Sequence, residues 1–182
     1  NYLGVDNGRN YFAEEAIEKN LKIIDLSNIN LISFATHALV SGELENLNEP
    51  GLILTPPSNP TMNDDGILTA SEITKLDLSN TNFVILSACN TTAGSDSDAE
   101  ELSGLSRAFF YSGARSILAS HWPVVSEIAP LITVGIFKNL YDSDYTITKS
   151  EAMRLSIMDY IKNSDEKLLH PSYWAAFSLI GG

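Results

Sequence analysis

Short apolar segments with the length of β-strands alternate with segments of helical periodicity along this chain. The apolar segments cover residues 30–36, 51–55, 82–88, 116–120 and 174–180. Apolar residues recur at helical spacing in residues 11–24, 102–113, 124–140 and 148–161. Strands that are apolar throughout are typical of a parallel sheet, because its crossover connections place helices on both faces. The alternation therefore predicts an α/β fold with a mostly parallel central sheet and helices on both faces.

Turn residues predict a hairpin in the first half of the chain. Residues 56–65 contain Pro56-Pro57, Asn59-Pro60 and Asp64-Asp65, a composition typical of turns. Residues 66–68 are apolar enough to return as a second strand beside residues 51–55.

Two capping boxes predict helix starts. Thr69 with Glu72, and Thr148 with Glu151, have the spacing at which each side chain reaches the other's backbone N–H. In the second helix we expect an inward face of Ala152, Leu155, Met158 and Ile161. Residues 124–140 are apolar on most sides, which predicts a largely buried helix.

Size and charge narrow the functional classes. The chain has 182 residues, enough for one domain with a substantial core, and we expect a single domain over 1–182. A formal charge of −12 argues against a nucleic-acid-binding surface. No apolar run reaches the roughly 18–20 residues of a membrane span, and no signal-peptide pattern opens the chain. We therefore expect a cytoplasmic protein that binds neither nucleic acid nor membrane.

The reactive residues are few. One cysteine and three scattered histidines provide neither a disulfide framework nor the usual zinc ligand sets. The sequence also lacks a Gly-x-Ser-x-Gly elbow, a phosphate-binding glycine loop and a dinucleotide fingerprint. Asp64-Asp65 does not have the spacing of a calcium loop. We expect no metal and no cofactor.

Two of the predicted strands are followed by a histidine and a cysteine. His37 comes after the strand at 30–36, and Cys89 after the strand at 82–88. Loops at the carboxyl ends of parallel strands carry the chemistry in α/β folds, so adjacent strands would bring the two side chains together. A free thiol of pKa about 8.5 is mostly protonated at neutral pH, and a nearby imidazole raises its thiolate fraction. Backbone N–H groups in the same loops are candidates for an oxyanion site.

Five segments, in order, resemble one known family. They are Phe34-Ala35-Thr36-His37, Leu86-Ser87-Ala88-Cys89-Asn90-Thr91, residues 104–115, Ser120-His121-Trp122-Pro123-Val124 and Tyr173-Trp174-Ala175-Ala176-Phe177. Together they resemble the CHAT domain, a caspase-like family of clan CD cysteine peptidases. Cys89 follows His37 at about the 50-residue separation seen in caspases.

This resemblance implies a caspase-like three-layer sandwich and a thiol protease that cleaves a protein or peptide substrate. Cys89 would be the nucleophile and His37 the general base and acid, with the backbone N–H groups of Ala38 and Cys89 binding the oxyanion. Such domains often occur beside helical repeats, which suggests a helical-repeat regulatory domain or partner. The family usually has Gly where this chain has Ala38, and usually begins with more upstream sequence, so we expect upstream sequence to be missing.

Other interpretations remain open at this stage. A lone cysteine after a core strand is often only a packing residue. A catalytically silent CHAT-like scaffold that binds other proteins would accommodate the change at Ala38. A latent protease, activated by a neighbouring repeat domain or by proteolytic cutting, is a third possibility.

The remaining polar candidates have weaker signals. Asp96, Asp98, Glu100 and Glu101 form an acidic cluster that we expect in the loop after Cys89. It is either a solvated loop or a site that recognises a basic substrate residue. His121 and Trp122 follow another strand and are expected to be structural or to line a substrate pocket. His170, before Pro171, is expected to be a capping or turn residue.

Overall fold

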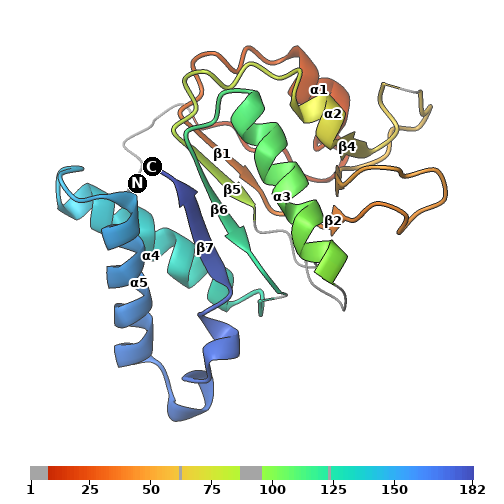
Figure 1. The fold of residues 1–182 in the computed structure, drawn as a ribbon. Helices are drawn as coiled ribbons and strands as arrows, with labels where there is room; N and C mark the ends of the chain where they lie inside the picture. Colours follow the sequence, from red (N-terminus) through yellow and green to blue (C-terminus); the bar gives the residue numbers. More distant parts are fainter. Residues whose placement is uncertain (1–7, 62, 87–95, 123) are drawn as a thin grey trace.

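The main sheet of the protein is mostly parallel (Figure 1). The computed structural model describes residues 8–61, 63–86, 96–122 and 124–182, with the backbone alone for residues 96–103. In this part of the chain the main sheet has four strands in the order β1-β5-β6-β7. They are β1 (Leu31–Phe34), β5 (Phe83–Leu86), β6 (Ser116–Ser120) and β7 (Phe177–Gly181). The first three are mutually parallel and β7 is antiparallel to β6, which confirms the predicted sheet.

Helices cover both faces of this sheet (Figure 1). The first face carries α1 (Glu18–Ile23), α2 (Ala70–Ile73) and α3 (Asp96–Tyr111), and the second carries α4 (Ile128–Asp142) and α5 (Lys149–Asn163). Side chains alternate along each strand, so Val84 packs in the first core while Phe83 and Ile85 pack in the second. The predicted three-layer α/β architecture is confirmed.

A second, smaller sheet lies beside the first helical layer. It consists, among the described residues, of β2 (Ala38–Leu39), β3 (Gly51–Ile53) and β4 (Ile67–Thr69), all antiparallel. The hairpin predicted between residues 51–55 and 66–68 is therefore confirmed. Thr69 also forms the predicted capping box with Glu72 at the start of α2.

The first predicted helix is shorter than expected. Residues 11–24 form a 3₁₀ turn, η1 (Ala13–Glu15), followed by α1. Between them Ile17 has extended backbone angles, with φ −103° and ψ 153°. The carbonyls of Ala13 and Ala16 accept hydrogen bonds from Thr55 at 2.7 and 2.9 Å, so this backbone is bound to the segment just after β3.

The third helix begins earlier than predicted. α3 starts at Asp96, so the backbone of Asp96, Asp98, Glu100 and Glu101 is helical, and the loop predicted there was wrong. Carboxylates are favourable in the first turn of a helix because its N-terminus carries a partial positive charge.

α4 and α5 bury narrower faces than predicted. α4 begins at Ile128 and buries Ile128, Ile132, Ile136 and Leu140, whereas Leu131 and Val134 are exposed. α5 buries Ala152, Ser156 and Tyr160, and the prediction that Met158 faces inward was wrong, because it is 54% exposed. A small pair sets this geometry: Gly135 of α4 lies directly against Ser156 of α5. Two short 3₁₀ turns, η2 (Glu166–Leu168) and η3 (Pro171–Tyr173), then lead to β7.

Candidate active site

The parallel strands of the main sheet end at one edge. In the register of the sheet Phe34 pairs with Leu86, and Leu86 pairs with Ala119. His37 follows Phe34 by three residues, and His121 follows β6 directly. Cys89 also comes three residues after its strand, but it lies outside the described residues. The structure therefore places β5, the strand that precedes Cys89, directly beside β1.

His37 lies in the short segment where the chain passes from the main sheet to the second sheet. Its side chain is exposed, while its backbone carbonyl accepts a hydrogen bond from the Ile53 N–H at 2.8 Å. The preceding residue makes the reciprocal contact, because the Thr36 hydroxyl donates to the Ile53 carbonyl. Ile53 of β3 thus binds the backbone of the candidate base and the side chain of the residue before it.

Ala38 fits its position without the conformational freedom of glycine. Its side chain is only 4% exposed and packs in the first core, and its φ lies outside the left-handed region. Ala38 pairs with Leu52. Because the bond from Ile53 to His37 flanks this pair, Ala38 and Leu52 exchange no ladder hydrogen bonds, and the Ala38 N–H is directed away from β3.

His121 and Trp122 lie at the same sheet edge with different contacts. The backbone N–H of His121 donates to the Ala176 carbonyl at 2.8 Å, and its ring Nε2 is 2.7 Å from the Ser178 hydroxyl. Trp122 packs against the second core, and its ring N–H donates to the Ser172 carbonyl at 2.8 Å. Both side chains thus have structural contacts beside the candidate site.

The outlying candidates are placed as follows. The predicted capping role of His170 is confirmed, since its Nδ1 accepts the Ser172 N–H at the start of η3. Asp96 and Asp98 belong to the first turn of α3, and their side chains lie outside the described part of the structure.

No three His, Cys, Asp or Glu residues within the described part of the chain are grouped so as to hold a metal ion. Nor does any helix there combine the length and apolarity required to cross a bilayer.

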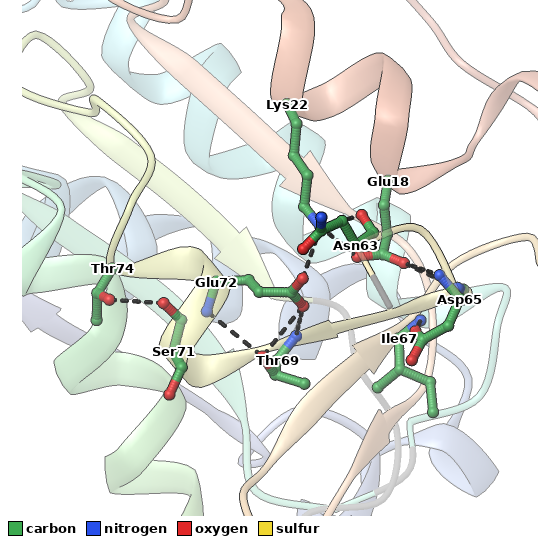
Figure 2. A network of polar contacts seen from close by, with 10 residues as sticks. Glu18, Lys22, Asn63, Asp65, Ile67, Thr69, Ser71, Glu72 and Thr74 are labelled. Carbon is green, nitrogen blue, oxygen red and sulfur yellow. Dashed lines mark hydrogen bonds and ion pairs between the residues drawn. The ribbon is translucent and has the colours of Figure 1, made fainter. Parts of the chain in front are cut away.

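Sequence reasoning missed a partly buried ionic network between α1, the turn before β4 and α2 (Figure 2). The Lys22 ammonium is 2.7 Å from a carboxylate oxygen of Glu18 and 2.7 Å from one of Glu72. Burial alone would lower the pKa of Lys22, but both carboxylates outweigh it and raise that pKa above the ordinary lysine value. Burial would raise the pKa of Glu72, but Lys22 and the Thr69 N–H lower it below its usual range. The lysine at i+4 from Glu18 was the only available sequence signal.

The sequence model of the CHAT domain matches residues 5–182. The chain belongs to the CHAT domain family. CHAT domains are related to the caspase-like peptidases of clan CD, which agrees with the α/β sandwich described above.

Two curated relatives share part of this CHAT domain. Tetratricopeptide repeat protein 28 of Mus musculus is 31% identical over 116 residues, and the protein of the same name from Homo sapiens is 29% identical over 116 residues. Each match covers 63% of this chain and only 4% of the relative. The similarity therefore concerns a small part of each relative.

Proposed function

We propose that this CHAT domain is a cysteine endopeptidase whose catalytic dyad is His37 and Cys89. The observation that carries the proposal is the register of β1 and β5. Because Phe34 pairs with Leu86, the chain leaves both strands at the same level of the sheet, and each candidate residue follows three positions later. A dyad requires its two side chains to lie close together, and the carboxyl ends of adjacent parallel strands favour this.

Each residue of the dyad has a defined task. The Cys89 sulfur attacks the scissile carbonyl carbon as a thiolate, and the His37 imidazole holds the thiol proton. The C–N bond breaks as the tetrahedral intermediate collapses, and His37 donates that proton to the leaving amine. Water, deprotonated by His37, then attacks the acyl-enzyme and releases the carboxylic acid and the free Cys89.

The oxyanion of the tetrahedral intermediate is assigned to the backbone N–H groups of Ala38 and Cys89. Two observations support the role of Ala38. Its N–H is directed away from β3, and its methyl group is buried in the core. Alanine therefore retains the donor that glycine supplies in most family members.

Substrate contacts are assigned to Asp96, Asp98, His121 and Trp122. A carboxylate near the start of α3 would pair with a basic substrate side chain, in a bidentate manner if the substrate residue is Arg. The names of the relatives refer to tetratricopeptide repeats, which are pairs of helices. On this basis we propose that a helical-repeat region, in the same protein or in a partner, regulates the peptidase, which is latent without it.

A catalytically silent scaffold is the second candidate. The presence of Ala38 in place of the family's usual Gly is the observation that favours it. The relatives, whose names refer only to repeats, are also compatible with an interaction module.

Cleavage of a proteome-derived peptide library separates the two candidates. The full chain is incubated with the library, alone and with the proposed helical-repeat region, and new peptide termini are identified by mass spectrometry. The peptidase proposal predicts termini that disappear in both Cys89→Ala and His37→Ala. Termini that persist in both variants, or no cleavage under either condition, would contradict it.

A further inference from the structure

Glu18 is a carboxylate enclosed by the protein. Its side chain is only 1% exposed. One oxygen accepts hydrogen bonds from the backbone N–H groups of Asp65 and Gly66 at 2.7 and 2.8 Å, and the other accepts one from Lys22 at 2.7 Å (Figure 2). A buried carboxylate is costly unless it is paired and hydrogen-bonded, and Glu18 is both.

Lys22 extends this contact to the other side of the turn. Its ammonium also donates to Glu72 and to the Asn63 carbonyl, each at 2.7 Å (Figure 2). Glu72 in turn accepts the Thr69 N–H at 3.0 Å. Residues 63–66 are therefore bound to α1 directly, and Thr69 is bound to it through Glu72 of α2.

From this turn, hydrogen bonds and the backbone between them lead to His37. The Gly66 carbonyl accepts the Leu54 N–H at 2.7 Å. The neighbouring residue is Ile53, whose N–H donates to the His37 carbonyl and whose carbonyl accepts the Thr36 hydroxyl. Glu18 is thus connected through Gly66, Leu54 and Ile53 to the candidate base.

The same N-terminal segment also holds the next residue of the hairpin. Thr55 donates from its backbone N–H to Ala16 and from its hydroxyl to Ala13. Space around the turn is restricted as well: a Cβ on Gly66, whose φ is +93°, would lie 2.8 Å from Pro56. The end of β3 is therefore held by α1 and its preceding turn, and has little room to shift.

We propose that Glu18, with Lys22 and Glu72, forms a positioning network that sets the location of His37 through the β3–β4 hairpin. The inference rests on the proposed His37–Cys89 dyad. A cluster that served stability alone could consist of apolar residues of similar size, which often replace buried ion pairs without loss. Here the Glu18 and Glu72 carboxylates accept hydrogen bonds from specific backbone N–H groups of the hairpin, and those groups determine where the hairpin meets His37.

The test uses Glu18→Gln and Glu18→Ala in the full chain, with Glu49→Gln as a matched control. Glu49 also accepts a backbone N–H, from Ser71 at 2.8 Å, but this bond joins the loop before β3 to the start of α2. Two quantities are measured well below the melting temperature: the hydrogen-exchange rate of the Ile53 amide, and the part of the Cys89 alkylation rate that requires His37.

The network predicts about tenfold faster exchange of the Ile53 amide in Glu18→Ala, because local opening of the hairpin becomes more frequent. The His37-dependent alkylation rate should fall about tenfold in the same variant. Glu18→Gln, which keeps an acceptor oxygen, should be intermediate, and Glu49→Gln should match the parent. If Glu18→Ala does not fold, Glu18→Gln and Lys22→Met provide the same comparison.

The outcomes separate the two proposals. If Cys89 is alkylated as fast in His37→Ala as in the parent, the proposed dyad is wrong. The network is then judged by the exchange rate of the Ile53 amide together with the NMR signals of the His37 ring. Unaltered Ile53 exchange and unaltered His37 signals in a folded Glu18 variant would overturn the positioning role, whatever the fate of the dyad.

Discussion

His37 and Ile53 are joined through their backbones: the Ile53 N–H donates to the His37 carbonyl at 2.8 Å. His37 follows a strand of the main sheet, whereas Ile53 belongs to the second sheet. Both sheets therefore fix the position of the candidate base, so changes in the β3–β4 hairpin should alter the reactivity of the proposed dyad.

Thr36→Val tests this dependence. The substitution removes the hydroxyl that donates to the Ile53 carbonyl, and should cost about 1 kcal/mol of unfolding free energy. We also expect slower His37-dependent alkylation of Cys89. Thr133→Val is the matched control, because its hydroxyl donates to Ala129 within α4. It should cost a similar free energy without changing alkylation, and equal alkylation in both variants would contradict the prediction.

The pKa shifts of Lys22 and Glu72 predict a pH window for the network. The pKa of Glu72 is lowered on folding, so its contribution to stability is present above its ordinary value of 4.5 and is lost as the pH falls through the folded value. The pKa of Lys22 is raised, so its contribution is present below 10.5 and is lost as the pH rises through the folded value. Urea unfolding of the parent and of Glu72→Gln should show a difference in free energy that shrinks below about pH 4.5. A difference in unfolding free energy that stays constant down to pH 3 would contradict the role given to the Glu72 carboxylate.

The contact between Gly135 and Ser156 predicts a rescue experiment. A Cβ at position 135 would collide with the Ser156 side chain, whose hydroxyl donates to Ile132 at 2.8 Å. Gly135→Ala should therefore destabilise the protein by about 1–3 kcal/mol through overpacking, despite the better helix propensity of alanine. Adding Ser156→Gly should recover part of this loss in a double-mutant cycle. Strict additivity of the two changes would show that the contact is unimportant.

Neighbouring residues of α4 should respond in opposite ways to truncation. Ile132 is 0% exposed and Leu131 is 61% exposed. Ile132→Ala should cost about 2–5 kcal/mol of unfolding free energy, whereas Leu131→Ala should stay within about 0.5 kcal/mol. Chemical denaturation of the two variants measures both values. A comparable loss in Leu131→Ala would show that the exposed face of α4 is covered in solution.

Much of the fold could be predicted because its strands carry local signals. The apolar segments at 82–88 and 116–120 gave two central strands, and the Thr69–Glu72 box gave the start of α2. The start of α3 was missed because the residues at 96–99 are small or acidic, a composition shared by loops and first helical turns. The orientation of α5 was missed because it depends on the Gly135–Ser156 contact with another helix, which no local pattern contains.

The placement of His37, and of the strand that precedes Cys89, could also be predicted. Strand ends directed attention to His37 and Cys89, and the observed register keeps β1 and β5 adjacent. The support of His37 by Ile53 could not be foreseen, since it requires the second sheet to pack beside the first. The burial of Glu18 could not be predicted either, because a glutamate in an amphipathic helix is ordinarily exposed and the sequence does not indicate the turn that covers it.

The rate of Cys89 alkylation as a function of pH is the most direct test of the proposed dyad. The parent chain and His37→Ala are compared with a small uncharged alkylating reagent, and circular dichroism verifies that both are folded. The dyad predicts a thiolate-like rate near or below neutral pH that collapses in His37→Ala, where the transition should move toward about pH 8.5. A slow rate with the same pH dependence in both proteins would contradict it.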